Sequence, residues 1–89
     1  MLFRSDTESG AESCQMDIFI SGAYEAEDQI PGSRVYLTVL SGMVEVQVGE
    51  EQWRLESRDS LAFPGHLPRH YINKGNTTVR LVERIMYQK

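Results

Sequence analysis

Apolar and polar residues alternate with a period of two along most of this chain, and no stretch of useful length shows the longer period of an amphipathic helix. The segment 44–48 is the clearest case, because three valines alternate there with Glu45 and Gln47. The same alternation recurs at 16–21, 35–40, 53–55 and 79–85. Successive side chains of a strand point to opposite faces, so the pattern predicts strands that each bury one face.

Turn-forming pieces separate these alternating segments. They are PGS at 31–33, SG at 41–42, GEE at 49–51, SRDS at 57–60 and NKGN at 73–76. Short strands with a turn roughly every ten residues predict an antiparallel all-β sandwich or barrel. The helix-prone piece AYEAED at 23–28 is too short to form a stable helix alone.

The start of the chain has a different composition. The segment SDTESGAES at 5–13 is polar, small and acidic, and it shows no periodicity. Such a segment cannot bury enough apolar surface to offset the entropy of ordering it. We therefore predict a polar linker or tail over residues 1–15 and one folded barrel domain over residues 16–89.

Charge and composition exclude several classes of partner. The formal net charge is −4 and the nine basic residues are scattered, whereas nucleic-acid binding needs clustered cations. No apolar run approaches the roughly 20 residues that a membrane span requires, and the acidic start does not look like a signal peptide. The lone Cys14 excludes an internal disulfide and fits a reducing compartment. We expect a cytoplasmic protein that contacts neither membrane nor nucleic acid.

The stretch VYLTVLSGMVEVQVGEEQWRLESRDSLAFPGHLPRHYINKGNTTVRLV, residues 35–82, orders these features as a strand, a turn glycine, a valine-rich strand, a hairpin, a proline loop and a final strand after an Asn-x-Gly turn. From about Gln29 to Tyr87 the sequence thereby resembles the cupin family, especially its small single-domain members. The resemblance implies an antiparallel double-stranded β-helix, or jelly-roll barrel. The most similar subgroup is the C-terminal cupin domain of XRE-type helix-turn-helix transcriptional regulators, and LFRSDTESGAES at 2–13 resembles the linker of that subgroup.

In the resembled family, two histidines and a glutamate of a first motif and one histidine of a second motif hold a metal ion. Counting back from the turn glycine Gly42, the position of that glutamate holds Val35. The two histidine positions fall within 28–31, which contains no histidine. Since imidazole and carboxylate are the ligands such a metal needs, the first motif has lost its ligands, and we expect no metal and no other cofactor.

The second motif is also altered. Aligning Pro68 and Asn73 with the family pattern places Arg69 at the histidine position, with His70 one residue late. A slip of one residue in a strand turns a side chain to the opposite face, so we expect His70 to point away from the interior. His66 is expected in an exposed loop.

Two interpretations of Arg69 remain open. A guanidinium stays protonated and is no ordinary metal ligand, but it binds carboxylates through paired hydrogen bonds. Arg69 either forms an internal pair with Glu83, which stands on an otherwise apolar strand face, or holds an anionic group of a ligand; we favour the internal pair. The candidate ligand-binding residues are Arg69, Tyr71, Val35, Leu37 and Glu83.

Two turn positions carry local expectations. Asn73 is expected to bond its own backbone ahead of Gly75. Arg58 replaces a glycine usual in the resembled family, so its backbone must avoid positive φ or tolerate strain.

Three functions are compatible with these residues. The first is a metal-free cupin domain, not an enzyme, that senses a small molecule and dimerises for a transcriptional regulator whose DNA-binding part is absent from this sequence. The face carrying Tyr36, Thr38 and Leu40 would then pack on a second copy in a homodimer, and an anionic ligand would suit Arg69. The second is a small metalloenzyme, an isomerase or dioxygenase, with His66, His70 and Glu83 as unusual ligands. The third is a purely structural dimerisation domain.

Overall fold

The computed structural model describes residues 3–4, 11–26 and 31–87. Within these ranges the elements are strands, and none of the described segments is a helix long and apolar enough to cross a membrane. The all-β prediction is thereby confirmed.

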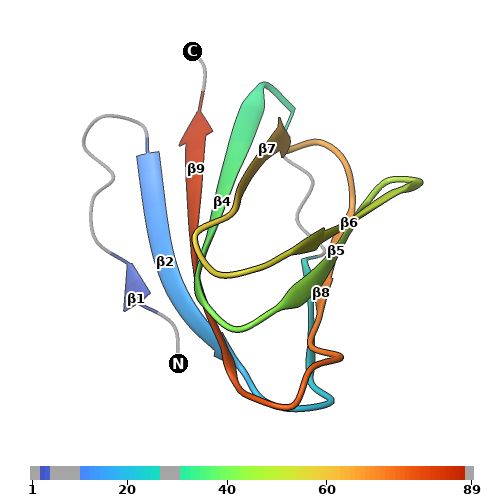
Figure 1. The fold of residues 1–89 in the computed structure, drawn as a ribbon. Helices are drawn as coiled ribbons and strands as arrows, with labels where there is room; N and C mark the ends of the chain where they lie inside the picture. The colour runs from blue at the N-terminus through green and yellow to red at the C-terminus, as the bar shows by residue number, and fades with distance from the viewer. Residues whose placement is uncertain (1–2, 5–10, 27–30, 88–89) are drawn as a thin grey trace.

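The described strands form two antiparallel sheets that face one another (Figure 1). A five-stranded sheet has the order β1-β2-β9-β4-β7 and a four-stranded sheet has the order β3-β8-β5-β6. The strand bounds are β1 Phe3–Arg4, β2 Ala11–Ile18, β3 Ala23–Ala26, β4 Ser33–Ser41, β5 Val44–Val48, β6 Glu51–Leu55, β7 Ser60–Pro64, β8 Arg69–Ile72 and β9 Val79–Tyr87.

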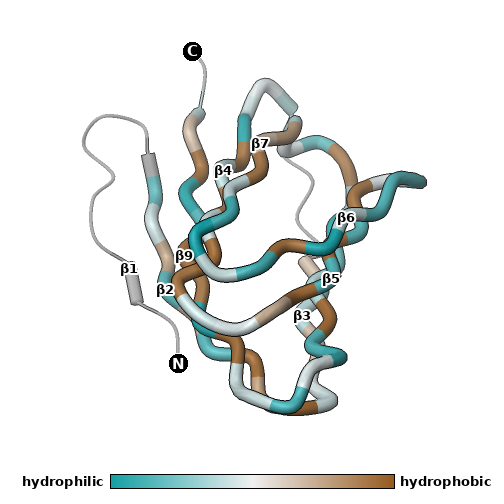
Figure 2. Tube along the Cα trace, viewed as in Figure 1, coloured by the Kyte–Doolittle hydropathy of each residue, from teal (hydrophilic) through white to brown (hydrophobic). Residues whose placement is uncertain are grey.

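The core lies between the inner faces of the two sheets. The valines and the leucine that alternate along β4 and β5 point inward and are at most 3% exposed: Val35, Leu37, Val39, Val44, Val46 and Val48. Figure 2 shows hydrophobic residues recurring along β5 and β9, with hydrophilic residues between them. The interior predicted from the period-two pattern is therefore the observed core.

The first long strand starts earlier than the composition indicated. β2 begins at Ala11 and pairs with β9 from Ala11↔Met86 to Ile18↔Val79, whereas the sequence placed the start of the folded part at residue 16. The difference arises because the ladder bonds come from backbone groups, which every residue but proline supplies whatever its side chain. The rest of the expected tail, residues 5–10, lies outside the described residues.

The helix-prone piece also joins a sheet. Residues 23–26 form β3, which pairs with β8, while residues 27–28 lie outside the described residues. Pairing with a neighbour outweighs a weak local preference for helix, because propensity is a small term compared with tertiary contacts.

The two turn expectations are resolved differently. Arg58 adopts a left-handed backbone with φ of 76°, so the turn tolerates strain instead of avoiding it. The backbone N–H of Arg58 donates to the Val39 carbonyl at 2.8 Å, which anchors this turn to β4.

Asn73 accepts a hydrogen bond from the Gly75 N–H at 2.9 Å, as predicted. Its side-chain amide also donates to the carbonyls of Ile18 at 2.9 Å and Thr77 at 2.8 Å, which joins the 73–77 turn to the end of β2.

Candidate functional site

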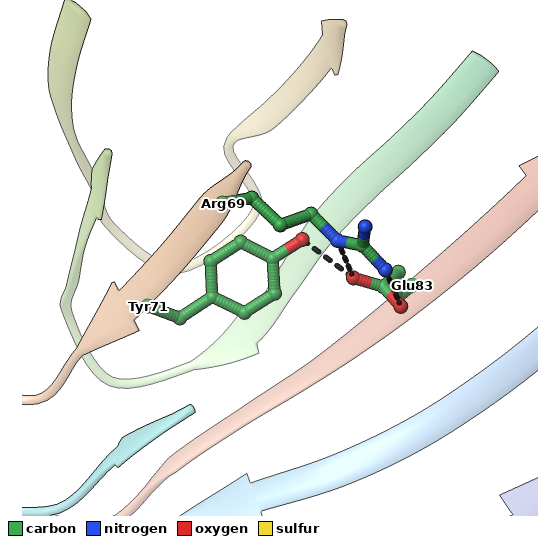
Figure 3. Close-up of polar contacts among 3 residues, drawn as sticks. All are labelled: Arg69, Tyr71 and Glu83. Carbon is green, nitrogen blue, oxygen red and sulfur yellow. Dashed lines mark hydrogen bonds and ion pairs between the residues drawn. The ribbon is translucent and has the colours of Figure 1, made fainter. Parts of the chain in front are cut away.

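Three polar side chains meet inside the cup formed by the two sheets. Arg69 and Tyr71 are two residues apart on β8 and therefore share its inner face, and Glu83 comes from β9 of the opposite sheet (Figure 3). The exposed fractions are 5% for Arg69, 2% for Glu83 and 0% for Tyr71. Charged residues are rarely buried to this degree unless they are paired.

The three side chains form one hydrogen-bonded network. Arg69 donates from Nε to Oε2 of Glu83 at 2.9 Å and from Nη2 to Oε1 at 3.1 Å. The Tyr71 hydroxyl donates to the same Oε2 at 2.5 Å (Figure 3). The internal pair that the sequence favoured for Arg69 is present in the structure. Bidentate, charge-assisted contacts of this kind are among the stronger hydrogen bonds in proteins.

The network fixes the protonation of two of its members. Burial acts to lower the pKa of Arg69, but the hydrogen bond and the charge of Glu83 outweigh it and raise that pKa above its ordinary value. Burial raises the pKa of Tyr71, and the neighbouring Glu83 carboxylate raises it further. Arg69 is thus a permanent cation and Tyr71 a neutral donor at physiological pH.

Part of the Arg69 guanidinium is not used by this network. A guanidinium carries five N–H donors, and Glu83 accepts from only the Nε–Nη2 side. Among the described residues, no hydrogen bond joins Nη1 to an acceptor, so the network leaves this end of the guanidinium unused. Both oxygens of Glu83, by contrast, already accept hydrogen bonds.

Glu83 lies on β9 between fully buried and half-buried residues. On the inner side of β9, Val79 and Leu81 are fully buried, whereas Ile85 and Tyr87 beyond Glu83 are only half-buried. The polar network therefore sits between the fully buried part of β9 and its half-buried end.

The structure brings the five candidate ligand-binding residues to one region. Leu37 of β4 is the direct cross-strand partner of Glu83, and Val35 pairs with the next inward residue, Ile85. Both side chains are buried beside the network formed by Arg69, Tyr71 and Glu83.

Sequence reasoning missed Tyr24. Its ring stacks on that of Tyr71 with 5.4 Å between centroids and 27° between planes, because β3 and β8 place the two residues opposite each other. Tyr24 and the buried Ala26 share one face of β3, with Glu25 between them on the other face. This spacing of two was the one sequence signal that could have identified a strand here.

The two histidines do not join the site. His70 faces the outer side of the four-stranded sheet, as its one-residue offset predicted, and its Nε2 lies 3.0 Å from Oε2 of Glu25. His66 lies in an exposed turn after β7. The structure therefore does not bring together His66, His70 and Glu83, the metal ligands that the metalloenzyme hypothesis requires.

The interior donors do not fit a divalent metal. Within the described parts of the chain, no group of three histidine, cysteine, aspartate or glutamate side chains could hold an ion. The buried Glu83 carboxylate is neutralised by Arg69, whose guanidinium would repel a cation.

Two facing antiparallel sheets with a polar network between them define a small double-stranded β-helix barrel. The chain belongs to the cupin family: the family model described as cupin domain matches residues 18–84. A search among curated proteins returned no match.

Solved structures share the fold at low sequence identity. The cupin domain of an XRE family transcriptional regulator from Enterobacter cloacae superposes with a TM-score of 0.93 at 18% identity, covering 100% of this chain and 97% of that one. An HTH_3 family transcriptional regulator from Vibrio cholerae gives 0.87 at 15% identity, covering 99% of this chain and 51% of that one. A de novo designed double-stranded β-helix gives 0.71 at 22% identity, over 82% of this chain and 96% of the design. The predicted family and fold are thereby confirmed.

Proposed function

We propose that this chain is a metal-free cupin module that binds a small molecule and forms homodimers for a transcriptional regulator whose DNA-binding part lies outside this sequence. The observation that carries the binding role is the partly used guanidinium of Arg69, buried beside the apolar core between the two sheets. Ligand pockets combine such apolar walls with a few placed polar groups.

The regulatory setting is supported by the structural likenesses. The Enterobacter cloacae domain is described as part of an XRE family transcriptional regulator, and this chain spans 51% of the Vibrio cholerae regulator. We carry that arrangement over to this chain as part of the proposal, with the cytoplasm as the compartment in which it acts.

The homodimer is supported by a contrast between the two outer faces. The outer face of the five-stranded sheet exposes Tyr36 by 43%, and Leu40 at the bulge in β4 by 46%. A shallow hollow of about 440 Å³ on this face is lined by Tyr36, Thr38, Val82, Arg84 and Met86. Exposed apolar surface rimmed by polar groups is typical of interaction sites.

The described strands of the four-stranded sheet carry no large hydrophobic side chain that is exposed, and ion pairs lie on their outer face. Glu25 lies beside His70 there, and Lys74 lies 3.4 Å from Glu45. We therefore assign the partner copy to the face that carries Tyr36, Thr38 and Leu40.

A thermal-shift screen with small acids, amides, amines and sugars tests the binding role. Any compound that raises the melting temperature of the native chain, and raises it less for Arg69→Lys, supports a ligand site at the network, because a ligand that binds only the folded state stabilises it. A native chain that responds to none of these chemical classes contradicts the binding role.

A purely structural dimerisation domain is the second candidate. The tight burial of Leu37, Val39 and Leu81, each 0% exposed, favours it. This candidate predicts a stable dimer together with no response in the ligand screen.

A further inference from the structure

The Arg69 guanidinium keeps unused hydrogen-bond donors inside the cup. Arg69 uses two of its five donors on Glu83, while both Glu83 oxygens and the Tyr71 hydroxyl proton are already engaged. Glu83 uses three of its roughly four lone-pair sites, while three N–H groups of Arg69 find no acceptor in the network, so a molecule that completes the guanidinium must supply oxygen acceptors.

The geometry of the unused donors is also specific. Since Glu83 occupies the Nε–Nη2 side of the guanidinium, the adjacent Nη1–Nη2 edge still carries two parallel N–H groups. Such an edge matches the two oxygens of a carboxylate.

Charge narrows the ligand class further. The Arg69 cation and the Glu83 carboxylate cancel, and an amine brought to Nη1 would meet the guanidinium charge, because a guanidinium carries donors and no acceptor. A doubly charged phosphate would leave more excess negative charge in a largely buried site than a monoanion would.

The side chains next to the network indicate that the ligand has an apolar body. Leu61 of β7 is level with Glu83, since both pair with Leu37, and Ile85 is the next inward residue on β9. Leu61 and Ile85 are partly buried hydrophobic side chains packed against the core at this end of the cup.

From these four observations we infer that the site takes a small monocarboxylate with an apolar body, held by the Nη1–Nη2 edge of Arg69, and that Glu83 is an internal carboxylate that competes for the guanidinium. This inference rests on the proposed ligand-binding function. It requires that removing the Glu83 charge strengthen carboxylate binding, which a purely structural ion pair would not do.

The experiment uses probes of one shape that differ in their polar group. Isovalerate, isovaleramide and isoamylamine, with inorganic phosphate as a second anion, are titrated by calorimetry into the native chain, Glu83→Gln and Arg69→Lys. We expect isovalerate to bind most tightly, to bind Glu83→Gln about tenfold more tightly, and to bind Arg69→Lys about tenfold more weakly. Glutamine keeps the shape of Glu83 but leaves a single oxygen for Arg69, so more of the guanidinium becomes available.

A measurement on the native chain covers the case in which a variant fails to fold. The guanidinium N–H resonances of Arg69, followed by NMR, should shift with isovalerate and stay in place with isoamylamine. Tighter binding of the amine, the amide or phosphate, or an unchanged or weakened acid affinity in Glu83→Gln, overturns the ligand class and leaves the sensing function standing. Absence of binding by all four probes, with unmoved Arg69 resonances, contradicts both.

Discussion

Arg69 and Glu83 belong to strands of opposite sheets and meet inside the cup, with Nε to Oε2 at 2.9 Å and Nη2 to Oε1 at 3.1 Å. The pair bridges the two layers at the point where the closed core gives way to half-buried residues. A bidentate pair fixes the distance and the angle between its partners, so it constrains how the sheets sit relative to each other.

Removing one member of this pair should destabilise the fold strongly. Arg69→Ala leaves a buried carboxylate without its cation, and we expect a loss of about 3–5 kcal/mol in the free energy of unfolding, measured by urea denaturation. The control is Arg80→Ala, which removes an exposed cation 3.1 Å from Asp17 and should change stability little. Equal losses in the two variants would contradict a buried pair.

Replacing the whole network by apolar residues should cost less than removing one partner. The combined variant Arg69→Met, Glu83→Leu and Tyr71→Phe leaves no buried charge or hydroxyl unpaired, so we expect it to be more stable than Arg69→Ala. The two midpoints of urea unfolding give the comparison. A triple variant less stable than the single one would show that the network is needed for folding beyond its charge balance.

Stability should depend on pH through Tyr71. Because the folded pKa of Tyr71 is raised, its stabilising effect is complete below the unfolded pKa of about 10 and declines as the pH rises above that value. There the unfolded chain loses a proton that the folded chain keeps, so the free energy of unfolding falls by about 1.4 kcal/mol per pH unit. Tyr71→Phe should remove this part of the slope, while Tyr36→Phe, at an exposed position, should retain it. Parallel pH profiles for the native chain and Tyr71→Phe would contradict the assigned shift.

Asn73 should matter far more than its neighbour in the same turn. Its side chain makes three hydrogen bonds, to Ile18, Thr77 and Gly75, and Asn73→Ala should cost about 2–3 kcal/mol by leaving these backbone groups without a side-chain partner. Asn76→Ala, at an exposed position, is the matched control. Thermal unfolding should separate the two variants by several degrees.

The proposed dimer face predicts a change of oligomeric state. Tyr36→Glu replaces an exposed aromatic ring by a charge in the hollow on the outer face of the five-stranded sheet, and sedimentation equilibrium should show it shifting the dimer to monomer. Gln47→Glu introduces the same charge on the outer face of the four-stranded sheet and should leave the dimer intact. The reverse result would move the interface to that sheet.

The sequence was sufficient for features that follow from alternation and charge. Valines at every second position of 44–48 predicted an inward face, and Glu83 on an apolar strand predicted a partner such as Arg69. The displacement of His70 to the outer face followed from its one-residue offset.

Other features depend on contacts between distant segments. Pairing of β2 with β9 determines that the strand starts at Ala11, and pairing of β3 with β8 stacks Tyr24 on Tyr71. Neither contact leaves a strong signal in the local sequence. Short polar or helix-prone segments adopt a strand conformation when a neighbouring strand offers backbone hydrogen bonds. Which edge of the Arg69 guanidinium stays unused likewise depends on the direction from which Glu83 approaches.

The polar interior of the cup is a network of Arg69, Glu83 and Tyr71 and not a set of metal ligands. Elemental analysis of the native protein, purified without chelators and after incubation with iron, manganese, nickel and zinc salts, tests this most directly. We expect far less than one equivalent of each metal per chain. Near-stoichiometric retention of any of them, lost on replacement of Glu83, would contradict it.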